Sequence, residues 1–206
     1  SGAQPYVLDH GQTRVISIDG GANQTFTLSA TAASRTSAAG TFNIPDLATF
    51  QIQINGSTTR PKTFSASEFV DNTVATAAEV VSSLNAFFLS QGLAALATVD
   101  TGAVKIATVR KGTGAIVNVV GGTANAGILA FTTGAIAGTG DASDIASTTA
   151  AEGVTKLATL TGSTASVSSG TVLVTSATTG ITSTVQVKNT TTATGAGFDN
   201  AVHAGS

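Results

Sequence analysis

The sequence contains no Cys, no Met and no Trp, and it has only one Tyr and two His among its 206 residues. Without Cys there is no disulfide framework, no thiolate zinc site and no cysteine nucleophile. Sugar-binding sites generally stack their ligands on Trp or Tyr, so the single Tyr, Tyr6, argues against a lectin or a carbohydrate-active enzyme. Few residue types remain from which an active site could be built.

Charge and long apolar runs are also scarce. Charged residues make up 10% of the chain, the formal net charge is −2, and neither sign forms a block. A nucleic-acid-binding protein would ordinarily carry a basic face. No run approaches the roughly 18 apolar residues of a membrane-spanning helix, and the first residues lack the basic and apolar regions of a signal peptide. We therefore expect no nucleic-acid partner, no membrane association and synthesis in the cytoplasm.

Small and β-branched residues dominate what is present. Thr (36), Ala (35), Gly (23) and Ser (20) fill more than half of the positions. With 42% apolar and few charged residues, the chain lacks the composition of a disordered protein. Because Thr, Val and Ile favour the pleated surface of a sheet, the composition predicts an α+β fold that is mainly β.

Residues 1–40 are predicted to form an N-terminal β arm and linker. Residues 14–18 and 24–28 alternate as half-buried strands do, and the turn-forming segment 19–23 lies between them. In residues 30–40 apolar residues do not recur with a regular spacing, and large side chains are few, which is typical of a linker.

Residues 41–134 are predicted to form a first ββαβββ module. Asn55-Gly56 is a strong signal for a turn between two strands. Thr76 and Glu79 have the spacing of a capping box, which starts a helix. The helix then places four apolar residues on one face, namely Val80, Leu84, Phe87 and Phe88. Three further strands are expected at 95–99, 103–109 and 115–120.

Residues 135–206 repeat this pattern in a degenerate form and are predicted to form a second, shorter module with a C-terminal tail. The helix start at 76–79 returns 73 residues later, at 149–152. The strands that follow the helix return 68 residues later, so the second copy is five residues shorter between helix and hairpin. This copy lacks a clear opening hairpin, unless residues 128–136 supply part of it.

The first module carries a resemblance to a known family. Residues 63–69 (TFSASEF), 75–80 (ATAAEV), 114–119 (GAIVNV) and 122–126 (GTANA) resemble, in this order, a repeat module of tailed-bacteriophage virion proteins. The resemblance covers roughly residues 49–131, with a weaker echo to about residue 200. It differs at Ala130-Phe131, where the family prefers Gly-Phe, and at Arg110-Lys111, where Ser or Thr is common. Such modules occur in capsid decoration, tail and fibre components, and the resemblance implies no enzyme and no cofactor.

The resemblance implies a structural protein of the virion, and we expect a capsid decoration (cement) protein that binds the major capsid protein or other virion subunits. Lattice positions on capsids favour closed symmetric oligomers, so a homo-oligomer is expected, with a trimer as the first choice. A tail-tube, fibre or baseplate component is the first alternative. A bacterial surface adhesin or flagellar-cap-like protein, for which Thr and Ser are equally suitable, is the second. Because Arg and Tyr concentrate at interface hot spots, the arm's Tyr6, Arg14 and Arg35 are the predicted contact residues.

Other site-like residues favour structural roles. His10 and His203 lie at opposite ends of the sequence and have no patterned third metal ligand. Asp141 and Asp144 lack the dense acidic spacing of a calcium loop and are better placed to cap a helix. The glycines at 112–114 and 121–122 do not continue as a phosphate-binding loop. We therefore predict no catalytic, cofactor-binding or metal-binding residue.

Overall fold

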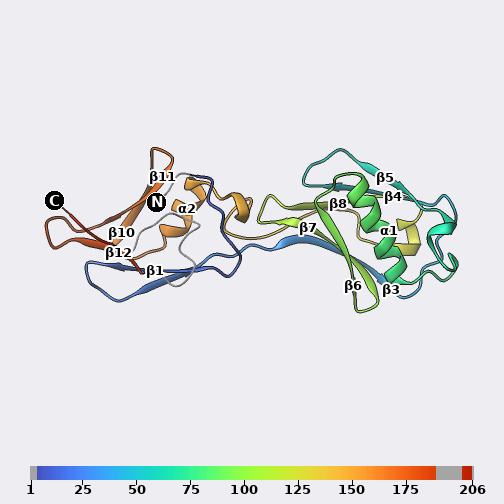
Figure 1. Ribbon diagram of the computed structural model, residues 1–206, viewed down its shortest axis with the longest axis horizontal. Helices are drawn as coiled ribbons and strands as arrows, with labels where there is room; N and C mark the ends of the chain where they lie inside the picture. Colours follow the sequence, from blue (N-terminus) through green and yellow to red (C-terminus); the bar gives the residue numbers. More distant parts are fainter. Residues whose placement is uncertain (1–3, 189–200, 206) are drawn as a thin grey trace. The chain divides into compact units, whose positions relative to one another are not determined.

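A computed structural model describes residues 4–188 and 201–205 (Figure 1). The predicted α+β class with strands in the majority is confirmed. The chain forms two compact units, and one of them is discontinuous in sequence: unit 1 comprises Ser1–Thr31 and Gly140–Ser206, and unit 2 comprises Ala32–Thr139. The sequence predicted domain boundaries at residues 40 and 134, whereas the contacts within the structure place them after Thr31 and after Thr139.

Unit 2 contains two antiparallel sheets and one long helix. The three-stranded sheet has the order β3-β7-β6, with β3 at Ala32–Ala39, β7 at Ala103–Lys111 and β6 at Ala95–Asp100. The four-stranded sheet has the order β5-β4-β8-β9, with β5 at Arg60–Thr63, β4 at Thr49–Ile54, β8 at Ile116–Gly121 and β9 at Gly134–Ala137. Helix α1, at Ala77–Ser90, packs against β6 and β7.

The core of unit 2 follows from the regular spacing of buried residues along its strands and its helix. Every second residue of β4 is buried, starting with Phe50, because successive strand residues point to opposite faces. Helix α1 buries one stripe that includes Leu84 and Phe88. The ring centroids of Phe50 and Phe131 lie 5.5 Å apart, which joins β4 to the segment after β8. The predicted helix and its apolar face are thus confirmed.

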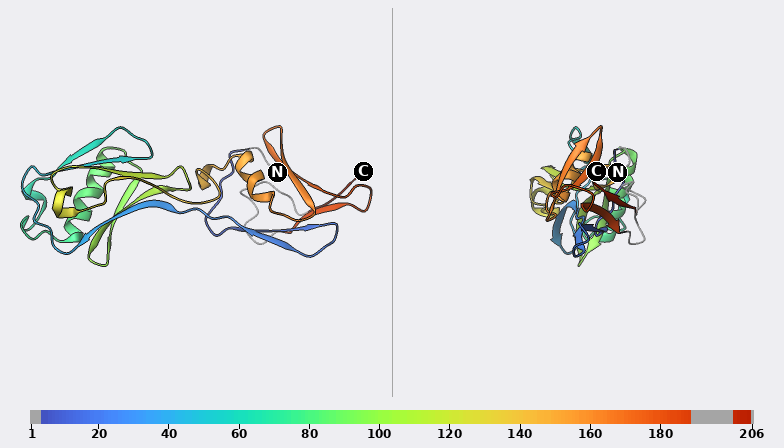
Figure 2. Two further views of the ribbon diagram at one scale, coloured as in Figure 1. Left: turned by 180° about the vertical axis from the view of Figure 1, so that it is seen from behind. Right: turned by 90° about the vertical axis from the view of Figure 1, so that its left-hand side faces the viewer.

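Unit 1 is built from both ends of the chain. Its four-stranded sheet has the order β13-β12-β1-β2, with β13 at Val202–Ala204, β12 at Thr184–Lys188, β1 at Thr13–Ile18 and β2 at Gln24–Thr27. A two-stranded sheet contains β10 (Ser163–Ser168) and β11 (Thr171–Ser176), and α2 (Ala150–Leu157) packs against both of its strands. Figure 2 shows the blue N-terminal hairpin within the same unit as the orange and red C-terminal elements.

The N-terminal segment is therefore not a separate arm, and this part of the prediction is wrong. β1 pairs with β12 over four residue pairs, from Val15 with Lys188 to Ile18 with Val185. Ile16 is 1% exposed and lies in the core of unit 1. Strand alternation was visible in the sequence, but the partner strand lies about 170 residues away and local patterns do not identify it.

The N-terminal hairpin supplies the opening hairpin of the predicted second module, which the described part of residues 135–206 does not contain. β1 corresponds to β4 at an offset of 36 residues, and the turns that follow them, Asp19-Gly20 and Asn55-Gly56, both have positive φ at both positions. Tyr6 bridges to Thr148 just before α2, as Phe42 bridges to Ala75 just before α1. Residues 128–136 belong to unit 2 and do not supply this hairpin.

Unit 2 is accordingly inserted within a second copy of its own scaffold. The insertion lies between Ala30 and Gly140, which form an antiparallel bridge. Gly140 has a φ of +147°, and a Cβ there would lie 2.4 Å from the carbonyl oxygen of Ser29. Only glycine fits so close a backbone approach at this φ.

Candidate functional site

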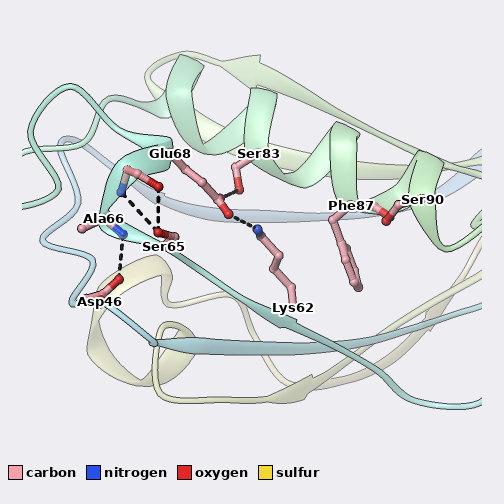
Figure 3. Close-up of polar contacts among 9 residues, drawn as sticks. Asp46, Lys62, Ser65, Ala66, Glu68, Ser83, Phe87 and Ser90 are labelled. Atoms are coloured by element: carbon pink, nitrogen blue, oxygen red, sulfur yellow. Dashed lines mark hydrogen bonds and ion pairs between the residues drawn. The ribbon is translucent and has the colours of Figure 1, made fainter.

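A hollow of unit 2 lies between strand β5 and helix α1 and has a volume of about 590 Å³. Figure 3 shows Lys62, Glu68, Ser83, Phe87 and Ser90 of its lining. Its lining is mostly polar and comprises Pro61, Lys62, Thr63, Glu68, Ser82, Ser83, Ala86, Phe87, Ser90 and Gln91. β5 is an edge strand, and Pro61 on it lacks a backbone donor, which blunts pairing with another strand at that position.

A polar network crosses this hollow. Lys62 Nζ lies 2.6 Å from Glu68 Oε1, and the Ser83 hydroxyl donates to Glu68 Oε2. Burial by itself raises the pKa of Glu68, but the hydrogen bonds from Lys62 and Ser83 and the charge of Lys62 outweigh it, and the pKa is lowered. Glu68 is therefore a carboxylate at neutral pH, and the network ties the turn at Ala66–Glu68 to α1.

The residues that carry the family resemblance serve the scaffold. Glu79 accepts hydrogen bonds from the backbone N–H groups of Thr76 and Val70, each at 2.8 Å. In unit 1, Glu152 accepts from Thr149 at 2.8 Å and from Ser143 at 2.6 Å. Each glutamate thus completes a capping box and also holds the loop that lies nine residues earlier in the sequence.

The glycine pair in the GGTANA segment also has a structural role. Gly122 has a φ of +109°, and a Cβ there would lie 2.3 Å from the carbonyl oxygen of Thr49. The Ala124 N–H donates to that same oxygen at 2.8 Å, and the Thr49 N–H donates to the Thr123 hydroxyl at 2.9 Å. The segment is therefore a connection packed against the start of β4 and not a phosphate loop.

Two of the three predicted contact residues are buried within unit 1. Tyr6 is 4% exposed, and its hydroxyl accepts from the Val172 N–H at 3.2 Å. Arg14 is 3% exposed at the position that corresponds to Phe50, and burial lowers its pKa. The prediction that these two residues contact a partner is wrong, because their side chains already pack inside their own unit. Arg35 in β3 is half-buried and reaches the carbonyl oxygens of Gly134 and Ala135 at 3.4 Å each; its predicted contact role stays a prediction.

The histidines and the acidic loop do not converge. His10 Nδ1 accepts from the Ala30 N–H at 3.0 Å, and His203 lies in β13. Asp141 pairs with Lys156 at 3.1 Å and Asp144 caps the short helix at Ile145–Ser147. Within residues 4–188 and 201–205, no three His, Asp or Glu side chains gather as a metal site would require.

A surface that sequence reasoning missed is repeated in the two units. The hairpins β6–β7 and β10–β11 each carry a valine at the second-to-last position of their first strand, and these valines, Val99 and Val167, are 50% and 49% exposed. Each lies opposite a buried valine of the next strand, Val104 or Val172. The exposed residues Leu96 and Leu173 lie on the opposite face of their hairpins from these valines, because successive strand residues point to opposite faces. Val99 and Val167 lie on the same face as the buried valines opposite them, and alternation gave no signal that they are exposed near the end of each hairpin.

No protein-family model, no curated protein and no solved structure matches the chain. In the part of the chain that the structure describes, no helix combines the length and the apolar character that a bilayer crossing requires.

Proposed function

We propose that this protein is a non-enzymatic structural component of a tailed-phage virion, and specifically a capsid decoration protein that binds the major capsid protein. The observation that carries the proposal is that the residues resembling the phage module build a scaffold that the chain contains twice. Their polar groups cap helices and hold loops, as in Glu79 and Glu152. A protein whose recognisable residues all maintain its shape is suited to act through the surfaces that the shape presents.

The proposed contacts are the exposed apolar ends of the two hairpins. Val99 and Val167 occupy corresponding positions and are exposed to the same extent, so one chain offers two similar contact points. Once one contact has formed, the second contact is held close to its own binding site, which raises its effective concentration there. The affinity of the two weak contacts together therefore exceeds the affinity of either alone. Repetition of this kind suits a particle surface on which identical subunits recur.

The test is binding to capsids assembled without this protein. Val99→Thr and Val167→Thr keep the side-chain shape and place a hydroxyl where a methyl group would be buried. We expect each single variant to bind about 5- to 30-fold more weakly, corresponding to about 1–2 kcal/mol, and the double variant to lose more than either. Val70→Thr is the matched control, because Val70 is 97% exposed and lies outside both hairpins.

Undiminished occupancy by the double variant would remove the hairpin ends from the interaction. Electron microscopy of virions carrying a tagged chain tests the function itself. Density on the head supports decoration, whereas density on the tail tube, fibres or baseplate would replace it with the alternative virion role. Absence from the particle, together with presence on a bacterial surface, would favour the adhesin or flagellar-cap-like alternative.

A further inference from the structure

Each unit contains the same backbone turn, held to a facing segment by the same pair of hydrogen bonds. In unit 2, residues 47–48 bond to both backbone groups of Phe64, at 3.0 and 2.8 Å. In unit 1, residues 11–12 bond in the same way to Leu28, at 2.8 Å each. The first residue of each turn has a positive φ. The two turns therefore occupy corresponding places in the scaffold.

The residue before each turn accepts a hydrogen bond from the backbone of the facing segment. In unit 2, Asp46 Oδ1 accepts from the Ala66 N–H at 2.8 Å (Figure 3). In unit 1, His10 Nδ1 accepts from the Ala30 N–H at 3.0 Å. Donor and acceptor are both shifted by the same 36 residues that relate β1 to β4. The scaffold thus keeps this bond, while its acceptor changes from a carboxylate to an imidazole.

In unit 1 this bond lies at the insertion point. Ala30 forms the antiparallel bridge with Gly140, and the Asp141 N–H donates to the Ser29 carbonyl at 2.9 Å. The Ala30 N–H donates to His10 instead of to the returning segment. Ala30 is 1% exposed, so its N–H is shielded from solvent while this bond holds. His10 therefore helps to fix the segment by which the chain leaves unit 1.

An imidazole nitrogen accepts a hydrogen bond only while it carries no proton. In a neutral imidazole one nitrogen is a donor and the other an acceptor, whereas both are donors in the imidazolium ion. Because Nδ1 of His10 accepts, the proton of its neutral form lies on Nε2. Protonation places a second donor opposite the Ala30 N–H, and the bond is lost. The carboxylate of Asp46 is not subject to this change, since histidine is the side chain that ordinarily changes its charge between about pH 5 and 8.

Other charged groups lie on the segments that pack around this point. They are Asp9, Arg14, Asp141, Asp144, Glu152 and Lys156. Asp141 is already paired with Lys156 at 3.1 Å, and Glu152 accepts from the backbone of Thr149 and Ser143. Carboxyl, ammonium and guanidinium groups ordinarily keep their charge between about pH 5 and 8. The imidazole of His10 is therefore the group that changes there.

We propose that His10 and the Ala30 N–H form a pH-sensitive latch at the insertion point, closed while the imidazole is neutral and open once it is protonated. Opening exposes the Ala30 N–H and loosens residues 29–30 against residues 140–141. The corresponding bond between Asp46 and Ala66 stays closed over the same pH range. The inference does not depend on the proposed function, so either can fail without the other.

Amide hydrogen exchange of the full chain, followed by NMR at pH 8 and pH 5, tests the latch. The protection factor compares each amide with an unstructured peptide at the same pH, which removes the effect of pH on the exchange chemistry itself. We expect the protection factor of Ala30 to fall at least about fivefold from pH 8 to pH 5, because a shielded donor loses its acceptor. The protection factor of Ala66 should be the same at both pH values.

Exchanging the two acceptors provides matched variants. His10→Asp gives unit 1 the acceptor of unit 2 and should make the protection of Ala30 independent of pH. Asp46→His should transfer the pH dependence to Ala66. His10→Ala removes the acceptor, so Ala30 should be weakly protected at both pH values. His203→Asn changes the other histidine of the chain, in β13, and should leave the pH dependence of Ala30 unaltered.

Nitrogen-15 NMR of the imidazole gives a second measurement that does not rely on exchange. At pH 8 it should place the proton of His10 on Nε2, and a proton on Nδ1 would overturn the latch. An Ala30 protection factor that is the same at pH 8 and pH 5 would also overturn it, as would an equal fall at Ala66. Retained pH dependence in His10→Asp would do the same, because no histidine would then remain beside Ala30.

Discussion

Units 1 and 2 share a scaffold but are packed and closed to different degrees. At the corresponding position of the first sheet strand, unit 2 buries the ring of Phe50 and unit 1 buries the side chain of Arg14. Helix α1 has 14 residues and α2 has eight. Unit 2 also has β3, which completes a three-stranded sheet, whereas among the described residues of unit 1 strand β11 pairs with β10 alone. The comparison shows that one fold can be kept by its turns and caps while its core is reduced.

The polar ties of the two units are conserved in place but not in residue type. Glu68 bonds to Ser83 of α1, and at the corresponding positions Asp141 bonds to Lys156 of α2. The carboxylate that fixes the loop before the helix is kept, and the partner on the helix changes from a hydroxyl to an ammonium group. The position on the helix therefore binds the carboxylate of the loop in both units, although its residue type differs.

The largest expected effect tests whether the two cores are independent. Phe50→Ala removes a side chain that is 0% exposed and packs on Phe131, and we expect a loss of about 3–5 kcal/mol of stability in unit 2. Hydrogen exchange should show β4, β7 and β8 deprotected while β1 and β12 keep their protection.

Leu89→Ala serves as the control, because Leu89 is 85% exposed on α1. It should change stability by no more than about 0.5 kcal/mol. If the Phe50 variant deprotected both units equally, the inserted unit and its host would be one cooperative body, and the separation of the two cores would be wrong.

Much of the fold could be predicted from the sequence, and the failures have a common physical cause. The helix at 76–88, the Asn55-Gly56 turn and the repeat of the capping box depend on residues close together in the chain, and all are present. The pairing of β1 with β12 depends on residues about 170 positions apart, and no local pattern specifies it. The search for a repeat in chain order missed the second opening hairpin because insertion placed it before the first copy.

The candidate surfaces were harder to predict than the fold. Residue type favours Tyr6 and Arg14 as contact residues, but type does not tell whether a side chain faces solvent or its own core. Val99 and Val167 were missed since their exposure depends on which strands lie opposite and on where each sheet ends.

A smaller effect should distinguish the helices. Thr149→Ala and Thr76→Ala each remove the hydroxyl that accepts an N–H at the third helical position, at a cost of about 1 kcal/mol. Because α2 has only eight residues and two of them are buried, we expect all its amides to lose protection, whereas α1 should fray only in its first turn.

Hydrogen exchange of the two variants checks this difference. Thr149→Ser keeps the hydroxyl and should behave as the unmodified chain does. Equal fraying of both helices would mean that the length and buried face of α1 do not protect it.

The smallest expected effect concerns the two polar ties and acid. Burial alone raises the pKa of Asp141, but hydrogen bonds from Ser29 and Lys156 and the charge of Lys156 lower it, as the ties of Glu68 do in unit 2. A carboxyl group whose folded pKa lies below its unfolded value stabilises the fold above that unfolded value, and this contribution is lost as the pH falls through the folded pKa. Both ties should therefore hold at pH 7 and weaken below the ordinary values of 4.5 for Glu68 and 3.8 for Asp141.

Denaturant unfolding at pH 7 and pH 3, resolved by unit through hydrogen exchange, measures this. Glu68→Gln should flatten the pH dependence of unit 2 and leave that of unit 1 unchanged, and Asp141→Asn should do the reverse. Both carboxylates are partly exposed to solvent, which screens their interactions, so the changes should be small beside those of Phe50→Ala. If Asp141→Asn altered the acid response of unit 2 instead, the tie at the insertion point would couple the two units, and the comparison of two self-contained scaffolds would fail.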